Sequence, residues 1–194
     1  RPCLIHGVTG SGKTEVYMEM IDKVLSEGRQ AIVLIPEIAL TYQTVMRFYN
    51  RFGDRVSIMN SKLSQGERFD QFERAKAGDI DITIGPRSAL FTPFPHIGLI
   101  IIDEEHETSY KSETAPRYHA RDVAIERARM NDASVLLGSA TPSVDSYYQA
   151  MQGKYQLLTL SERVEKKPLP DCEVVDLRSE LRAGNRSIFS ERLQ

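Results

Sequence analysis

A glycine-rich run near the start of the chain, HGVTGSGKT, has the residue types and spacing of a phosphate-binding loop. Glycines let the backbone close around phosphate oxygens, so that N–H groups and the positive end of a following helix face the anion. The lysine of such a loop can reach the β- and γ-phosphates of a nucleotide, and the hydroxyl after it can ligate Mg²⁺. The expected nucleotide contacts are Gly7, Thr9, Gly10, Ser11, Gly12, Lys13 and Thr14, and Thr14 is also an expected Mg²⁺ ligand.

An acidic run, DEEHE, follows directly after the apolar residues Leu99 to Ile102. In open α/β sheets, ligands bind at the carboxyl ends of the strands, where a phosphate loop also lies. We therefore expect Asp103 to hold Mg²⁺ and Glu104 to polarise a water molecule for attack on the γ-phosphate. Glu105 and Glu107 are expected instead to cap the next helix or to face solvent.

A third run, LLGSATPS, places hydroxyl groups after another apolar segment. Ser139 and Thr141 are expected beside the acidic run, where hydrogen bonds could relay the state of the γ-phosphate. Ser143 is expected to be the N-cap of the next helix, which leaves Ser139 and Thr141 available for that relay.

Alternating apolar and amphipathic segments must position these groups. Runs that are apolar throughout are typical of parallel strands covered on both faces. Because these runs alternate with segments of helical periodicity, the sequence predicts an α/β fold with a central, mostly parallel sheet flanked by helices on both faces. The expected strands are Leu4–His6, Ala31–Ile35, Val56–Met59, Ile80–Ile84, Leu99–Ile102 and Ser134–Leu137. The expected helices are Thr14–Leu25, Ala39–Phe52, Ser64–Ala77 and His119–Met130.

The sequence changes in character near residue 160. Residues 1–160 are expected to form one domain, and residues 161–194, which are charged and poor in apolar runs, are expected to form an exit segment with one edge strand at Glu173–Leu177. The chain begins with Arg1 rather than Met, so we expect it to be a piece of a longer protein.

Composition excludes several classes of protein. The net charge of −2 means that any contact with nucleic acid must come from a local patch. No apolar run has the length of a membrane span, so no membrane contact is expected. Cys3 and Cys172 lack the paired spacing of a zinc site or a disulfide framework, and they are expected to be buried small residues in a reducing, cytoplasmic setting.

The three runs, in the order GVTGSGKT, DEEH and SATPS, resemble the first motor lobe of superfamily 2 helicases. Further runs, LIPEIALT, GPRSALFTPF and PRYHARDVA, are similar to the primosomal protein N′ family of bacterial replication-restart helicases. The similarity extends from about Gly7 to Ser143. It implies a RecA-like P-loop NTPase fold and a lobe that binds ATP and Mg²⁺ in a 3′-to-5′ DNA helicase.

The resemblance also implies roles for individual residues. His106 would link the γ-phosphate to Ser139 and Thr141, so that with Lys13, Asp103 and Glu104 it completes the expected catalytic set. Arg87 and Ser88, in the run GPRSALF, would contact the DNA backbone. Pro86 stands where the family pattern would have a threonine, so no phosphate contact is expected at that position.

The run SYKSETAPRYHAR is similar to the aromatic-rich loop of that family. Tyrosines can stack on bases, and basic side chains can meet phosphates. The expected contacts that couple DNA to hydrolysis are Tyr110, Lys111, Arg117 and Tyr118. The alternative is that Tyr110 and Tyr118 pack under the next helix and that Arg121 pairs with Asp122 or Glu126. For Tyr118 and His119, a structural role and a functional role are equally good expectations.

The resemblance implies partners that lie outside these residues. They are forked or single-stranded DNA, a second helicase lobe and a DNA-binding domain of the same protein, other primosome proteins and single-strand binding protein. The second lobe would supply arginine fingers, and zinc-binding cysteines would lie elsewhere, so no zinc is expected here. Two other functions remain open: a P-loop kinase or similar nucleotide enzyme, and a catalytically silent module that binds primosome proteins.

Overall fold

A single parallel sheet forms the centre of the molecule. The computed structural model describes residues 1–164 and 171–193. Seven strands pair in the order β3-β4-β2-β5-β6-β1-β7, and every pair is parallel. Their bounds are β1 Cys3–Gly7, β2 Gln30–Leu34, β3 Val56–Ile58, β4 Ile82–Gly85, β5 Ile97–Asp103, β6 Ser134–Ser139 and β7 Gln156–Leu160.

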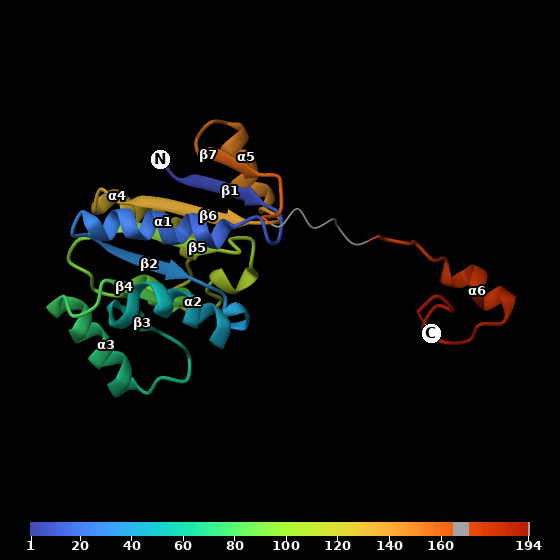
Figure 1. Ribbon diagram of the computed structural model, residues 1–194, viewed down its shortest axis with the longest axis horizontal. Coiled ribbons are helices and arrows are strands. Elements are labelled where there is room, and N and C mark those ends of the chain that lie inside the picture. Colours follow the sequence, from blue (N-terminus) through green and yellow to red (C-terminus); the bar gives the residue numbers. More distant parts are fainter. Residues whose placement is uncertain (165–170, 194) are drawn as a thin grey trace.

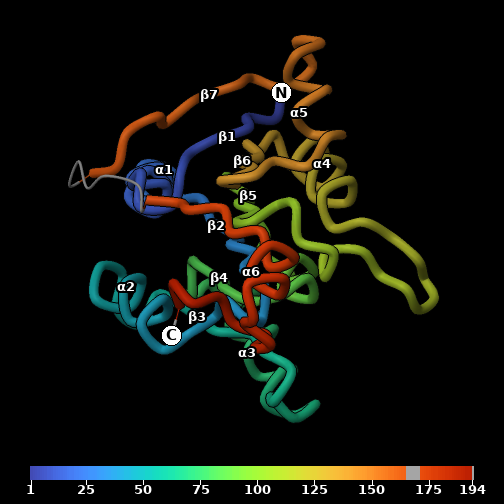
Figure 2. Tube along the Cα trace, turned by 90° about the vertical axis from the view of Figure 1, so that its right-hand side faces the viewer, coloured from blue at the N-terminus to red at the C-terminus, as the bar shows by residue number. Residues whose placement is uncertain are grey.

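Helices cover both faces of this sheet. They are α1 Lys13–Ser26, α2 Tyr42–Phe52, α3 Gln65–Ala77, α4 Ala120–Met130, α5 Val144–Met151 and α6 Leu177–Ala183, with short 3-10 helices η1 Glu37–Ala39, η2 Gly53–Arg55, η3 Arg87–Phe91 and η4 Thr108–Tyr110. α1 and α2 lie on one face, and α4 and α5 lie on the other (Figures 1 and 2). The predicted α/β architecture with a parallel sheet between two helical layers is confirmed.

The two faces are built from alternate residues of the same strands. In β5, Leu99 and Ile101 pack with α1 and α2, whereas Ile100 and Ile102 pack with α4. All four side chains are fully buried. Because both faces are covered, the strand is apolar without interruption, which is why its sequence shows no alternation.

The register of the strands brings the three chemical runs together. β6 lies between β1 and β5, and it pairs Gly138 with Asp103 on one side and Ser139 with His6 on the other. The phosphate loop leaves β1, the acidic run leaves β5, and the SATPS run leaves β6. All three runs therefore leave the sheet at its carboxyl edge, where α/β proteins bind ligands.

Polar side chains fix the starts of several helices. Ser64 and Glu67 form a reciprocal capping box at α3, and the Thr41 hydroxyl caps α2. The predicted cap of α5 is confirmed, because the Ser143 hydroxyl accepts the Ser146 N–H. Such caps each stabilise a helix by about 1 kcal/mol.

One expectation for the second half of the chain is wrong. No strand forms at Glu173–Leu177, because the Asp176 carboxylate accepts the Arg178 N–H and so starts α6. The edge strand beside β1 is β7 instead, at Gln156–Leu160. α6 lies apart from the sheet in Figure 1.

The two cysteines also differ from expectation. Cys3 is only partly buried, and Cys172 is exposed. Burial raises the pKa of the Cys3 thiol. The expectation of two buried cysteines is therefore wrong, because Cys3 lies near the start of the chain and Cys172 lies outside the packed sheet.

Candidate functional site

The phosphate loop makes a tight turn between β1 and α1. Gly10 and Gly12 have φ angles of +81° and +89°, a region that residues with a side chain rarely adopt. A β-carbon on Gly7 would lie 2.5 Å from Ser11 Oγ, so the loop closes on the end of β1 too tightly for a larger residue. The glycines at these positions are therefore required by the backbone of the loop.

Polar groups of the loop point into a pocket suited to phosphates. Lys13 Nζ donates a hydrogen bond of 2.8 Å to the carbonyl of Gly7. Within the described residues, the buried Oγ of Ser11 has no hydrogen-bond partner. A pocket of about 650 Å³ is lined by Thr9 to Glu15 together with Asp103 and Glu104, and Arg47, Arg163 and Val164 complete its wall. The unpaired Ser11 hydroxyl and the Lys13 ammonium group, which bonds a backbone carbonyl of the loop, are both groups that could bind phosphate oxygens.

Asp103 is held by hydrogen bonds to its side chain and to its backbone. Its Oδ1 accepts a hydrogen bond of 2.8 Å from the Tyr17 hydroxyl, and its backbone carbonyl accepts one of 2.7 Å from the Tyr110 hydroxyl. Burial raises the pKa of Asp103, whereas the Tyr17 hydrogen bond and the charge of Lys13 act in the opposite direction. A partly buried carboxylate with one oxygen fixed leaves the other oxygen for a cation.

Tyr17 reaches Asp103 only because residue 138 is glycine. A β-carbon on Gly138 would lie 1.7 Å from the Tyr17 hydroxyl. The glycine before SATPS therefore makes room for the phenol that orients the acidic run. Tyr17 was missed by the sequence analysis, although its place four residues after Lys13 on the buried stripe of α1 is a signal, because a buried tyrosine needs a partner for its hydroxyl.

Glu104 occupies an unusual backbone conformation. Its φ angle is +48°, which costs energy for a residue with a side chain, and strained residues of this kind cluster at functional sites. Burial raises the pKa of Glu104, and the neighbouring Asp103 charge raises it further. The carboxylate borders the same pocket as the phosphate loop.

His106 and Ser139 are neighbours, as the sequence analysis expected. His106 Nδ1 lies 2.7 Å from Ser139 Oγ and 3.7 Å from Glu104 Oε2. Ser139 Oγ also accepts a hydrogen bond of 3.0 Å from the Thr141 N–H. These contacts connect the acidic run with the SATPS run at the end of β6. The relay role of His106, Ser139 and Thr141 remains a prediction.

Glu105, which was expected to cap a helix or face solvent, is only 2% exposed. Its carboxylate accepts hydrogen bonds from Ser143 and Ser146 at the start of α5. It thus caps a helix, but α5 rather than the helix that follows it in sequence. Nothing in the acidic run distinguishes Glu105 from Glu107, because the partners of Glu105 come from a distant part of the chain.

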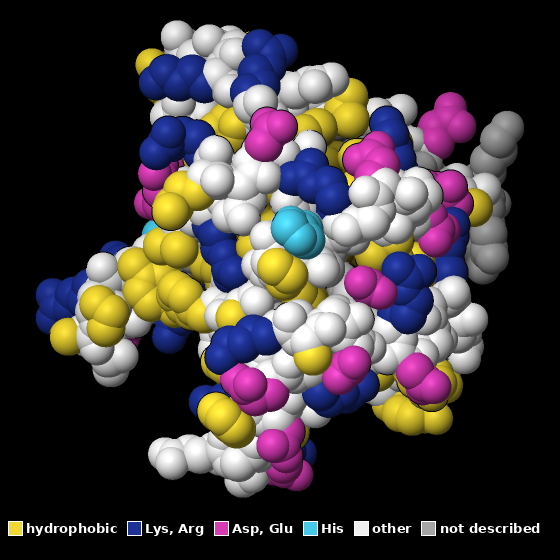
Figure 3. Space-filling model, turned by 90° about the vertical axis from the view of Figure 1, so that its left-hand side faces the viewer, with side chains coloured by type: hydrophobic (Ala, Val, Ile, Leu, Met, Phe, Trp, Pro, Cys, Tyr) yellow, Lys and Arg dark blue, Asp and Glu magenta, His cyan; other side chains and the backbone are white. Residues whose placement is uncertain are grey.

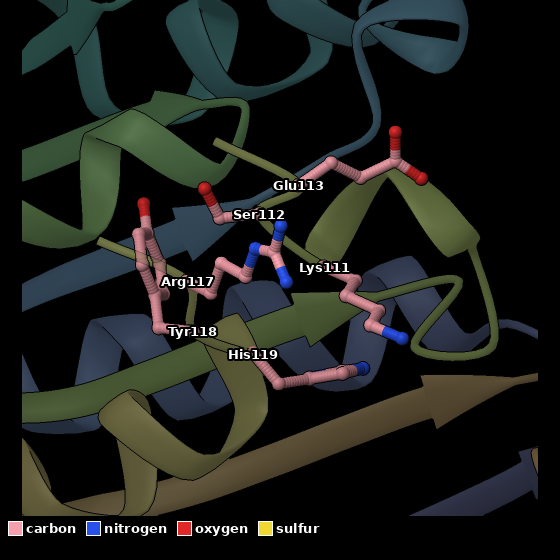
Figure 4. Close-up of a pocket in the computed structure, with 6 residues that line it drawn as sticks. All are labelled: Lys111, Ser112, Glu113, Arg117, Tyr118 and His119. Atoms are coloured by element: carbon pink, nitrogen blue, oxygen red, sulfur yellow. The ribbon is translucent and has the colours of Figure 1, made fainter. Parts of the chain in front are cut away.

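The loop between β5 and α4 projects from the face that carries α4 (Figure 2). A pocket of about 550 Å³ on this loop is lined by Lys111, Ser112, Glu113, Arg117, Tyr118 and His119. In Figure 4 the Lys111 and His119 side chains extend in the same direction, and Glu113 extends away from them. Lys111 and Arg117 are exposed, so both charges are accessible to a phosphate backbone.

Arg87 connects this loop to η3. Its Nη1 donates to the carbonyls of Ser109, at 3.2 Å, and Lys111, at 2.5 Å. Its guanidinium also lies 5.4 Å from the centre of the Tyr118 ring, which packs edge-on against Phe91. A DNA phosphate would therefore compete with the loop for Arg87.

Tyr110 lies differently from the other expected loop contacts. It is 1% exposed, and its hydroxyl bonds the carbonyls of Leu34 and Asp103. The ring is thus unavailable for base stacking in this structure, because it fills the core beneath α4. Exposed Ser88, with Pro36, Glu37 and Arg87, lines a third pocket of about 280 Å³ near Tyr110.

The face at the amino ends of the strands carries basic and acidic side chains close together (Figure 3). For example, Arg55 Nε forms a salt bridge of 2.7 Å with Asp81 Oδ2. Interspersed charges of both signs create no strong field of one sign.

The chain is similar to known helicases and to replication restart proteins. A family model described as DEAD/DEAH box helicase matches residues 1–150. The chain is 54% identical to replication restart protein PriA of Bacillus subtilis over 190 residues, which cover 98% of this chain and 24% of that protein. It is 48% identical to replication restart protein PriA of Synechocystis, again over 98% of this chain and 24% of that protein. The chain thus spans about a quarter of the length of these curated relatives.

Two solved structures share the fold. The Pyrococcus furiosus Hef helicase domain superposes with a TM-score of 0.58 at 20% identity, over 85% of this chain and 36% of that chain. RecG bound to a three-way DNA junction gives a TM-score of 0.58 at 24% identity, over 83% of this chain and 21% of that chain. Among the described residues, no helix is long and apolar enough to cross a membrane.

The family model covers most of the chain, including the phosphate loop, the acidic run and the SATPS run. The three runs meet at one edge of the sheet, in the arrangement that their chemistry requires. The chain belongs to the DEAD/DEAH box helicase family.

Proposed function

We propose that this chain is the ATP-binding lobe of an ATP-dependent 3′-to-5′ DNA helicase that acts in replication restart. The observation that carries the proposal is one pocket that contains the phosphate loop, Asp103 and Glu104. The similarity to replication restart proteins over almost the whole chain supports the cellular role.

The residues of the pocket divide the chemistry among them. The loop from Gly7 to Thr14 would bind the phosphates, with Lys13 released from the Gly7 carbonyl to meet the β- and γ-oxygens. Thr14 and Asp103 would hold Mg²⁺, which neutralises charge on the phosphates when it is bound. Glu104 would accept a proton from the attacking water.

DNA would act on this pocket from the loop side. Arg87 and Ser88 would contact the backbone, and Lys111, Arg117 and Tyr118 would meet phosphates or bases. Tyr110 would serve in coupling rather than stacking, because its hydroxyl bonds the Asp103 carbonyl directly. The contact between His106 and Ser139 provides a second connection, towards Thr141.

The complete machine requires parts beyond this chain. We propose residues 1–160 as the motor lobe and residues 161–194 as the segment that leads to a second lobe. The second lobe would supply the arginine finger, which is worth about 10³–10⁵ in rate, so the isolated lobe should be nearly inactive. Further partners would be forked or single-stranded DNA, a DNA-binding domain, primosome proteins and single-strand binding protein, all in the cytoplasm.

The proposal is tested by ATP hydrolysis of the full-length protein, with and without forked DNA. Forked DNA should stimulate the wild-type rate, and Glu104→Gln should lower kcat by about a hundredfold or more, because a general base is lost. Glu107→Gln is the matched control, since it removes a carboxylate from the same run and should retain DNA-stimulated turnover. Hydrolysis that ignores DNA would favour a different nucleotide enzyme.

A further inference from the structure

Glu105 is a buried carboxylate inside the acidic run. It adjoins Glu104, and its backbone N–H bonds the carbonyl of Gly138 at 3.0 Å. That bond joins the turn after β5 to the end of β6. Glu105 therefore belongs to the backbone that holds Glu104 at its positive φ angle.

Both carboxylate oxygens of Glu105 are occupied. Oε1 accepts a hydrogen bond of 2.6 Å from the Ser143 N–H. Oε2 accepts two hydrogen bonds, one of 3.1 Å from the Ser143 hydroxyl and one of 2.8 Å from the Ser146 hydroxyl. The amino end of α5 also places positive backbone dipoles against the carboxylate. A buried carboxylate is costly unless its oxygens are paired in this way.

The network continues from Ser146 to α4. The Ser146 hydroxyl has one hydrogen to donate, and it donates it in the hydrogen bond to Glu105. Ser146 Oγ also accepts a hydrogen bond of 3.0 Å from Arg121 Nη1. The hydrogen bonds therefore run in one direction, from Arg121 through Ser146 to Glu105. Arg121 also pairs with Asp122 at 3.3 Å, and its backbone N–H is accepted by His119 Nδ1 at 3.2 Å.

This network joins two regions that the proposed function must connect. Arg121 lies in the first turn of α4, directly after the loop that we expect to meet DNA. Glu105 lies directly after Glu104. A shift of the first turn of α4 would change the hydrogen bond to Ser146, and through it the support of the turn that carries Glu104.

We propose that Glu105 is a positioning residue, which with Ser146 and Arg121 transmits the position of the DNA-facing loop to Glu104. The inference rests on the proposed function, because it assumes that Glu104 activates water. It assigns a role to the third residue of the acidic run that is distinct from metal binding and from proton transfer.

A purely structural role would predict a different outcome. If Glu105 serves only to cap α5, its substitution should lower stability and leave the response to DNA unchanged. Ser146→Ala separates the two possibilities, since it removes the link to Arg121 while the Ser143 N–H and hydroxyl still bond Glu105. It is also a mild change, so it keeps the test valid if Glu105→Gln fails to fold.

The experiment measures ATP hydrolysis of the full-length protein across a titration of forked DNA. Glu105→Gln, Ser146→Ala and the double variant are compared with the wild type, and Tm is recorded for each. Asp145→Asn is the matched control, because it removes an exposed carboxylate from the same helix end, whereas the hydrogen bonds to the Glu105 carboxylate come from Ser143 and Ser146. The readouts are the ratio of DNA-stimulated to DNA-free kcat and the KM for ATP.

We expect Glu105→Gln and Ser146→Ala each to lower the stimulation ratio by about tenfold, with KM for ATP within about twofold of the wild-type value. The double variant should be no worse than Glu105→Gln alone, because both changes break one network. Asp145→Asn should resemble the wild type.

The outcomes separate this inference from the proposed function. Wild-type hydrolysis that does not respond to DNA would overturn both. If DNA stimulates hydrolysis by the wild type and Ser146→Ala shows the same stimulation ratio, the inference is overturned and the proposed function stands. Additive losses in the double variant would also contradict a single network.

Discussion

Asp103 is oriented by two tyrosines that come from different parts of the chain. Tyr17 in α1 donates to its carboxylate, and Tyr110 in η4 donates to its carbonyl. Burial raises the pKa of both phenols, so both remain protonated donors at neutral pH. The acidic run is thus fixed by the phosphate-loop helix on one side and by the loop after β5 on the other.

Tyr17→Phe removes one hydroxyl from this arrangement and leaves the ring. Because a hydrogen bond to a charged group contributes about 1.5–3 kcal/mol, we expect kcat to fall by about tenfold or more and half-maximal activity to require more Mg²⁺. A Mg²⁺ titration of ATP hydrolysis by the full-length protein measures both effects. Tyr42→Phe, which alters an exposed tyrosine of α2, is the control, and equal behaviour of the two variants would refute the role of Tyr17.

Gly138→Ala should disturb the same site by steric overlap. The added methyl group would meet the Tyr17 phenol, and overpacking of this kind costs about 1–3 kcal/mol. We expect a lower Tm and a loss of hydrolysis at least as large as that of Tyr17→Phe. Gly66→Ala is the matched control, because a β-carbon there lies 4.0 Å from its nearest neighbour. Wild-type hydrolysis by Gly138→Ala would contradict this geometry.

The sequence identified the phosphate loop, Asp103 and Glu104 because their chemistry depends on residue type and local spacing. It could not identify Tyr17 or Glu105 in the same way. Their roles depend on Gly138 and Ser146, which become neighbours only when the parallel strands pair. Tyr110 shows the converse, since an aromatic residue in a loop proved to be buried.

Strands and helices were predictable where both faces of the sheet are covered. β2 and β5 are buried along nearly their whole length, and continuous apolar runs mark them in the sequence. β7 lies at the edge of the sheet, where β1 is its one partner strand among the described residues, and it is largely exposed. Its position depends on an unoccupied edge of the sheet rather than on its own pattern, and so its residues carry no comparable signal.

The start of α4 should respond to pH. His119 Nδ1 accepts the Arg121 N–H as an N-cap, and burial, with the charge of Arg121, lowers the pKa of His119. The folded state favours the neutral ring, so the cap contributes its stability above the unfolded pKa of about 6.5 and loses it as the pH falls below that value. The cap is worth about 1 kcal/mol.

Hydrogen exchange in the first turn of α4 measures this effect in the full-length protein. Protection factors should fall by several-fold between about pH 7.5 and about pH 5.5. His119→Asn keeps a capping acceptor that does not titrate, and it should remove the pH dependence. Equal pH dependence in wild type and His119→Asn would show that another group is responsible.

The whole lobe is organised around one edge of its sheet. The phosphate loop, the acidic run and the SATPS run leave β1, β5 and β6 there, and the loop between β5 and α4 begins at the same edge. The fold therefore places nucleotide chemistry and the proposed DNA contacts a few hydrogen bonds apart. A chain of net charge −2 needs such a local arrangement, since its overall field does not attract DNA.

The central claim is that DNA controls ATP hydrolysis through the loop between β5 and α4. The most direct test compares the DNA-stimulated rate of the full-length wild type with that of Lys111→Ala/Arg117→Ala. A control, Lys23→Ala/Lys76→Ala, removes the same charge from α1 and α3. We predict that forked DNA stimulates the wild type and the control strongly and the loop variant only weakly. Stimulation of the loop variant equal to that of the control, at saturating DNA and at subsaturating DNA alike, would contradict the account.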